Sequence, residues 1–109
     1  MTFSVRIHPA AVESIRDAHD WISERSPEAA SRWLAGLEEA VLSLRDMPER
    51  CGLAPEHKQL KFELRQYIYG KRSGRYRILF VVRGNHVHVL EVRHGARRPL
   101  TPRDLRPPE

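Results

Sequence analysis

Residues 75–94 read RYRILFVVRGNHVHVLEVRH, and this stretch decides how the chain folds. Apolar side chains occupy both sides of residues 75–83, which indicates a central strand that is buried on both faces. Gly84 and Asn85 are typical of a two-residue hairpin turn, and a second strand follows from His86 to Arg93 or His94. The stretch therefore predicts an antiparallel β-hairpin in the middle of a sheet.

Four further elements are found by working outward from this hairpin. A strand is expected from about Glu63 to Tyr69, before the turn cluster at residues 70–74. Residues 2–7 alternate as a short half-buried strand, and residues 9–25 carry apolar side chains at helical spacing. A second helix follows Ser26-Pro27-Glu28, a pattern typical of a helix N-terminus, and ends near Asp46.

The order strand, helix, helix, strand, strand, strand predicts an α+β fold. The link between the helices is very short, so they should form an antiparallel hairpin, in which Trp21 and Trp33 are expected to pack. Because each amphipathic element needs an apolar partner, this hairpin should cover one face of a mostly antiparallel sheet. We assign residues 1–98 to a single domain. Residues 99–109, rich in Pro and Arg, are expected to form a C-terminal tail without regular structure.

Composition excludes several classes of protein. The chain has 109 residues, which suffice for one domain, and lacks a run of roughly 18 apolar residues that could span a membrane. No signal-peptide pattern is present, so a cytoplasmic location is expected. The single Cys51 excludes a disulfide framework and a multi-cysteine zinc site. His86 and His88 share a face but lack nearby acidic or cysteine partners, so we expect no metal and no cofactor.

The net charge of +5 is unevenly distributed along the chain. Residues 1–50 hold 6 basic and 9 acidic residues, whereas residues 51–109 hold 13 basic and 5 acidic residues. Sixteen of the 19 basic residues are arginine, whose planar guanidinium suits bidentate contact with phosphate or carboxylate. The C-terminal half therefore suits an anionic partner, either nucleic acid or an acidic protein segment, although a merely soluble basic face explains the composition equally well.

The expected hairpin register gathers basic residues at its open end. If residues 84–85 form the turn, Arg77 lies opposite Val92 and Arg75 opposite His94, all on one face of the sheet. Further basic residues border the same end, namely Lys71, Arg72, Arg97 and Arg98. Two guanidinium groups and an imidazole are therefore expected to converge.

This set of side chains suits cleavage of RNA, in which a ribose 2′-hydroxyl attacks the adjacent phosphodiester. Arginine stabilises negative charge that develops on phosphate, and histidine transfers a proton near neutral pH. A second acid or base is not evident. Both residues also have a structural interpretation. Arg77 can form an ion pair with an acid such as Glu63 or one from the preceding loop, and His94 can be an ordinary residue at the end of a strand.

Two segments resemble the C-terminal half of the RelE/ParE superfamily of type II toxin–antitoxin toxins. They are residues 70–80, GKRSGRYRILF, and residues 87–98, VHVLEVRHGARR. SPEAA at residues 26–30, followed by Trp33-Leu34, resembles the start of that family's second helix, and MPER at residues 47–50 resembles the loop that ends it. The resemblance covers residues 3–98, with the same order of elements.

The resemblance implies a growth-inhibiting toxin that is neutralised by a cognate antitoxin, whose extended and often acidic segment wraps it. Operator DNA would be bound only through the antitoxin. In the superfamily, RelE-like members cut mRNA in the ribosomal A site, and ParE-like members poison DNA gyrase. Arg77 matches a functional arginine of the RNA-cleaving branch, Arg97 falls near a second, and His94 is similar to a catalytic histidine. The residues expected to contact the target or the antitoxin are Lys71, Arg72, Arg75, Arg93 and Arg98.

Two departures from the RNA-cleaving pattern favour the ParE-like branch. Ile68 and Gly70 stand where that pattern has lysines, and no tyrosine follows Tyr76. We therefore expect a gyrase poison, with a ribosome-dependent mRNA endonuclease as the alternative, and leave open whether the chain is an enzyme. A non-toxic module that binds nucleic acid or protein is a further alternative.

Overall fold

The computed structural model describes residues 2–105, apart from the side chain of Ser73. The helices and strands are β1 (Ser4–Ile7), α1 (Pro9–Ser23), α2 (Pro27–Ser43), β2 (Arg65–Tyr69), β3 (Tyr76–Arg83) and β4 (His86–His94). Short 3-10 helices lie between them, at η1 (Pro48–Arg50), η2 (Pro55–Gln59) and η3 (Arg72–Gly74). This order confirms the predicted α+β fold, with element ends that differ by two or three residues at most places.

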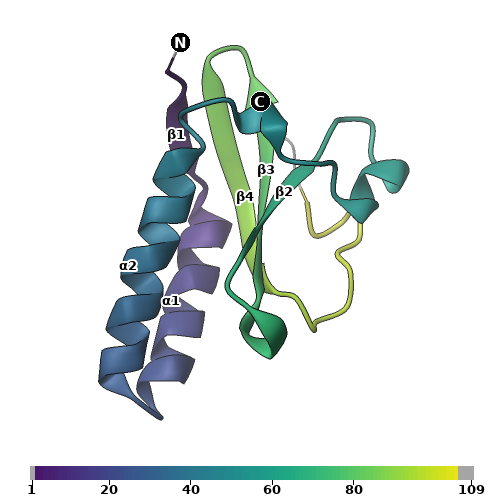
Figure 1. Cartoon of the computed structure of the whole chain (residues 1–109). Helices are drawn as coiled ribbons and strands as arrows, with labels where there is room; N and C mark the ends of the chain where they lie inside the picture. Colours follow the sequence, from purple (N-terminus) through teal and green to yellow (C-terminus); the bar gives the residue numbers. More distant parts are fainter. Residues whose placement is uncertain (1, 106–109) are drawn as a thin grey trace.

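The strands form one mixed sheet in the order β1-β4-β3-β2 (Figure 1). β1 runs parallel to β4, whereas β3 is antiparallel to both β4 and β2. The hairpin of residues 75–94 therefore lies in the middle of the sheet, as predicted. β1 pairs with β4 only as far as Val89, so in the described chain the second half of β4 has no strand on that side.

The β3–β4 hairpin has the predicted register near its turn and a different one near its open end. Pairing runs from Arg83 and His86 to Phe80 and Val89 as expected. A β-bulge follows, in which β4 contributes one extra residue, Leu90. Such a bulge moves every later residue of β4 to the opposite face of the sheet.

The bulge overturns the pairs predicted for the open end of the hairpin. Arg77 lies opposite Arg93 instead of Val92, and His94 lies opposite Tyr76. The prediction was wrong because it continued the alternation of residues 86–89 through residue 94, although Glu91 stands where the next inward apolar residue is due and the apolar pattern resumes one position later, at Val92. Val92 therefore points into the core beneath the helices, where it packs with Tyr76.

Helices α1 and α2 form a hairpin that covers one face of the sheet (Figure 1). The Ser26 hydroxyl accepts a hydrogen bond from the amide of Ala29 at 3.2 Å, and Pro27 occupies the first helical position, so α2 begins where the sequence predicts. The largest side chains buried beneath the helices are Leu37, Leu44, Ile78, Phe80, Val87 and Val89. Among the described residues, no helix is long and apolar enough to span a bilayer.

The opposite face of the sheet is covered by loops (Figure 1). Residues between α2 and β2 and residues after β4 form a second apolar cluster there, composed of Ala54, Leu64, Leu79, Val81, Leu90, Leu100 and Leu105. Residues 99–105 contain no helix or strand, and yet Leu100 and Leu105 are buried. This part of the tail therefore packs on the sheet, while residues 106–109 lie outside the described chain.

Candidate functional site

Basic side chains surround an open hollow of about 400 Å³ where β2 and β4 end and β3 begins. We call it the cationic hollow. The charged and polar residues that line it are Gln66, Arg72, Arg75, Arg77 and His94. Two guanidinium groups and an imidazole therefore line one hollow, but they do not share one face of the sheet as predicted, because His94 lies opposite Tyr76 on the helix-covered side and Arg77 points to the loop-covered side. His94 reaches the hollow because it is the last residue of β4.

The turn between β2 and β3 places exposed cations at the rim of the cationic hollow. Gly70 adopts a φ of +96°, and a Cβ at this position would lie 2.6 Å from the carbonyl oxygen of Gly74, so the turn requires glycine. Arg75 donates from Nε to the carbonyl oxygen of Arg72 at 3.0 Å, which closes the turn. Lys71, Arg72 and Arg75 are all exposed, and the turn therefore presents three positive charges to solvent.

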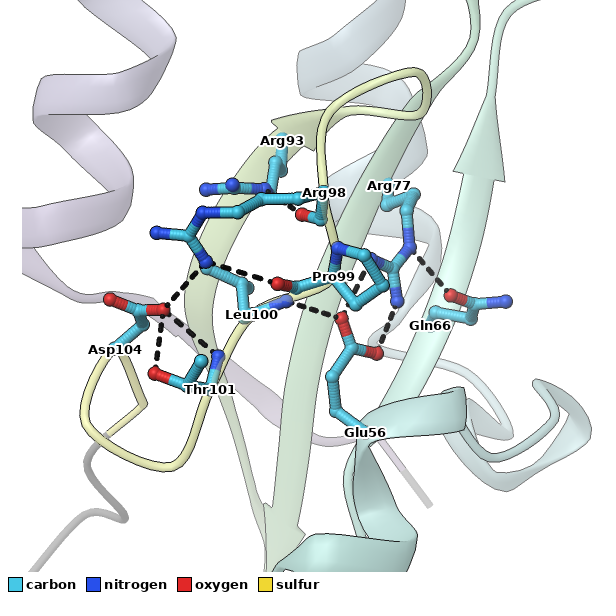
Figure 2. A network of polar contacts seen from close by, with 9 residues as sticks. All are labelled: Glu56, Gln66, Arg77, Arg93, Arg98, Pro99, Leu100, Thr101 and Asp104. Atoms are coloured by element: carbon cyan, nitrogen blue, oxygen red, sulfur yellow. Dashed lines mark hydrogen bonds and ion pairs between the residues drawn. The ribbon is translucent and has the colours of Figure 1, made fainter.

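Arg77 is held in a buried ion pair with Glu56 of η2 (Figure 2). Nη1 donates to Oε2 at 2.8 Å, Nη2 donates to Oε1 at 2.5 Å, and Nε donates to Oε1 of Gln66 at 2.9 Å. The side chains of Arg77 and Glu56 are 12% and 3% exposed. The loop thus supplies the acidic partner, whereas Glu63 lies 3.9 Å from Arg65 instead.

Glu56 also fixes the tail to the sheet. Its Oε2 accepts a hydrogen bond from the amide of Leu100 at 3.0 Å, so one carboxylate joins η2, β3 and the tail (Figure 2). Burial alone would raise the pKa of Glu56, but hydrogen bonds from Arg77 and Leu100 and the charge of Arg77 outweigh it and lower the pKa to about 2. Sequence analysis missed Glu56 because its only signal was a single acid in an aperiodic loop.

His94 has a fixed ring orientation. Its Nδ1 accepts a hydrogen bond from the amide of Ala96 at 3.0 Å, and its ring packs edge-on against Tyr76 at 5.1 Å between centroids. Because Nδ1 accepts this bond, the proton of the neutral ring lies on Nε2. The neutral ring can therefore donate a hydrogen bond from Nε2, whereas transfer of a proton to another group would need the imidazolium form.

The remaining predicted site residues lie beyond the cationic hollow. Arg93 is buried and donates from Nε to the carbonyl oxygen of Arg98 at 3.0 Å. Arg98 lies 3.4 Å from the carboxylate of Asp104, and Arg97 is exposed. Arg93, Arg97 and Arg98 therefore do not line the cationic hollow, although Arg93 lies opposite Arg77 in the strand pair.

Other reactive side chains have structural contacts. Nε2 of His8 and Nδ1 of His88 lie 3.0 Å apart, and residues 2–105 contain no group of three or more His, Cys, Asp or Glu arranged to hold a metal ion. Burial raises the pKa of the Cys51 thiol, although Arg50 and Arg65 oppose the shift. The thiol is therefore protonated at neutral pH and is a weak nucleophile.

Comparison with known proteins gives three consistent matches. Residues 5–99 match the family described as the ParE toxin of the type II toxin–antitoxin system parDE. The chain is similar to Toxin RelE1 of Caulobacter vibrioides, with 33% identity over 96 residues that cover 87% of this chain and 96% of that toxin. Its fold is similar to that of a chain in the chromosomal ParDE TA system from P. aeruginosa, with a TM-score of 0.68, 16% identity, and coverage of 85% of this chain and 96% of that chain.

Proposed function

Because this chain belongs to the ParE toxin family of type II toxin–antitoxin systems, we propose that it stops growth by binding DNA gyrase. A cognate antitoxin neutralises it, and the toxin reaches operator DNA only through that antitoxin. The observation that carries the choice of gyrase over mRNA is the ion pair between Arg77 and Glu56.

The ion pair argues against a role for Arg77 in RNA cleavage. A catalytic arginine must contact the scissile phosphate, but Glu56 and Gln66 already accept hydrogen bonds from all three guanidinium nitrogens of Arg77. The charge of Arg77 is already compensated by a carboxylate whose pKa is about 2, in a charge-assisted bidentate pair, and only one N–H on each terminal nitrogen remains for a phosphate. Ile68 and Gly70 add no positive charge at the positions where the RNA-cleaving pattern has lysines.

The exposed cations of the β2–β3 turn are the proposed contacts with an acidic partner. Arg72 and Arg75 line the cationic hollow and Lys71 precedes them in the same turn, and complementary charge there would steer an acidic segment of gyrase or of the antitoxin. Arg98 is exposed and available to the same partner, whereas Arg93 is buried and contributes less.

A ribosome-dependent mRNA endonuclease is the second candidate. It is favoured by the position of His94 beside Arg75 and Arg77 in the cationic hollow and by the 33% identity with a protein named Toxin RelE1. In this candidate the imidazolium of His94 gives its proton to the leaving oxygen and becomes neutral, and Arg77 and Arg97 contact the phosphate. Arg77 would have to share its charge between the phosphate and Glu56.

Induction in a test bacterium distinguishes the two candidates when gyrase supercoiling and mRNA ends are measured in the same culture. We expect loss of supercoiling activity, a DNA-damage response and intact mRNA. Cleavage of mRNA within codons, with supercoiling unchanged, would contradict the proposal.

Two variants sharpen this experiment. The double variant Arg72→Gln/Arg75→Gln is expected to lose growth inhibition, whereas His94→Gln is expected to retain it. Arg16→Gln, which removes an exposed arginine from α1, is the matched charge control. Loss of inhibition in His94→Gln, with the circular dichroism spectrum unchanged, would favour the endonuclease.

A further inference from the structure

A second hollow, of about 410 Å³, lies on the other side of His94, between α1 and the end of β4. We call it the aromatic hollow. The residues that give it chemical character are Asp17, Trp21, Tyr76, Arg93, His94 and Arg97. It combines two arginines with three aromatic rings, and the exposed cations of the β2–β3 turn do not border it.

Arg93 gives the aromatic hollow a largely buried guanidinium that, among residues 2–105, has no carboxylate within 4.0 Å and whose terminal nitrogens reach solvent. Its side chain belongs to a residue that is 9% exposed, and its Nε donates to the carbonyl oxygen of Arg98. Within residues 2–105, its two terminal nitrogens have no hydrogen-bond partner and no carboxylate within 4.0 Å. Figure 2 shows the guanidinium extending away from Arg77.

The surroundings of Arg93 make an anion favourable at this position. Burial and the nearby charges of Arg97 and Arg98 lower the pKa of Arg93, in spite of Glu91 and Asp104, but a guanidinium remains charged at neutral pH. A largely buried guanidinium that already lies near two other arginines is stabilised by an anion at its exposed nitrogens. A bound phosphate could accept bidentate hydrogen bonds from the free fork of Arg93 and contact Arg97 as well.

Trp21 gives the same hollow a stacking surface. The sequence predicted that Trp21 packs in the helical hairpin, but the side chain is 52% exposed, unlike Trp33, which packs on the core. The guanidinium of Arg25 lies 4.3 Å from its ring centroid and restrains the ring. An exposed aromatic ring close to arginines is typical of surfaces on which nucleobases stack.

We propose that the aromatic hollow binds a nucleotide, with its phosphate on Arg93 and Arg97 and its base against Trp21. Asp17 lines the hollow and can accept hydrogen bonds from the N–H groups of a base. An acidic peptide fits less well, because it makes little use of the three rings. The ligand is either a free nucleoside monophosphate or the terminal nucleotide of a single strand, and the inference goes beyond the proposed binding of gyrase.

Calorimetric titration of the full chain with GMP tests the proposal. We expect saturable binding, and at least tenfold weaker binding of both guanosine and inorganic phosphate, because each has only half of the contacts. The same titration with a single-stranded tetranucleotide that carries a 5′-phosphate distinguishes a free nucleotide from the end of a strand as the ligand. Tighter binding than GMP identifies a strand end as the ligand, and equal or weaker binding identifies a free nucleotide.

Three variants locate the binding to the aromatic hollow. Trp21→Leu and Arg97→Gln are each expected to weaken GMP binding about tenfold, in line with the usual contribution of base stacking and phosphate contacts. Arg93→Lys keeps the charge but removes the fork and should have a similar effect, whereas Arg16→Gln should change the affinity less than twofold.

Either of two results would overturn the proposal. One is the absence of saturable GMP binding at millimolar concentration. The other is GMP binding that Trp21→Leu and Arg97→Gln leave unchanged while their circular dichroism spectra match that of the parent chain.

Discussion

The two faces of the sheet are covered in different ways. Two helices cover one face, and every buried side chain of the core beneath them is apolar or tyrosine. Loops and the tail cover the other face, where an apolar cluster adjoins the ion pair of Glu56 and Arg77. The packing of apolar side chains therefore stabilises the helix-covered face, whereas the loop-covered face is also stabilised by one ion pair.

Removal of a large core side chain should have the greatest effect on the helix-covered face. Phe80 is fully buried under the helices, so Phe80→Ala leaves a cavity and should lower the free energy of unfolding by about 4 kcal/mol. Urea denaturation monitored by circular dichroism measures this loss. Phe80→Leu is the control with a smaller loss, and a loss below about 1 kcal/mol for Phe80→Ala would contradict the assignment of this core.

Removal of one charge should have the greatest effect on the loop-covered face. Glu56→Gln leaves the guanidinium of Arg77 buried without a carboxylate, which should cost about 3 kcal/mol of unfolding free energy. The double variant Glu56→Gln/Arg77→Met should regain part of that loss, because no unpaired charge remains. Glu63→Gln, at an exposed acid near Arg65, should change stability by less than about 0.5 kcal/mol.

Low pH should act on the loop-covered face in particular. The pKa of Glu56 falls from its ordinary value of 4.5 to about 2 on folding, so the ionised carboxylate stabilises the fold above about pH 4.5. That contribution, about 3 kcal/mol, is lost progressively as the pH falls toward 2. The stability difference between the parent chain and Glu56→Gln should therefore shrink between pH 5 and pH 2. A constant difference over this range would contradict the ion pair.

The smallest predicted effect concerns the start of α2. Ser26→Ala removes the hydroxyl that accepts the hydrogen bond of the Ala29 amide and should cost about 1 kcal/mol. Ser31, an exposed residue within α2, is the matched position, and Ser31→Ala should be neutral or slightly stabilising. Thermal denaturation of the two variants measures the difference, and equal melting temperatures would contradict a capping role for Ser26.

The helix-covered face could be predicted from the sequence because its signals are local. Tyr76, Ile78 and Phe80 alternate with Leu79 and Val81, and the structure places the two sets in separate apolar clusters as this alternation predicts. Apolar periodicity shows which side of an element is buried without reference to any distant residue.

The loop-covered face and the details of the site depend on information that is not local. Glu56 forms hydrogen bonds with Arg77, 21 residues later in the chain, and with Leu100, 44 residues later. No periodic pattern in the sequence connects Glu56 to either residue. The extra residue at Leu90 leaves only a local trace, the shift of the inward apolar positions from Val87 and Val89 to Val92, which the predicted register does not take into account. The sequence predicted that Arg75, Arg77 and His94 come close together, but it did not predict that Arg77 forms an ion pair with Glu56.

The bulge at Leu90 has a consequence for chain length. Deletion of Leu90 alone would allow β4 to pair with β3 without interruption, and it would keep Val92 opposite Ile78 and Arg93 opposite Arg77. A strand that straightened with Leu90 retained would instead place Val92 opposite Arg77 and turn Arg93 toward the helices. The bulge therefore lets this hairpin hold one residue more than regular pairing allows while each later side chain of β4 keeps its side of the sheet.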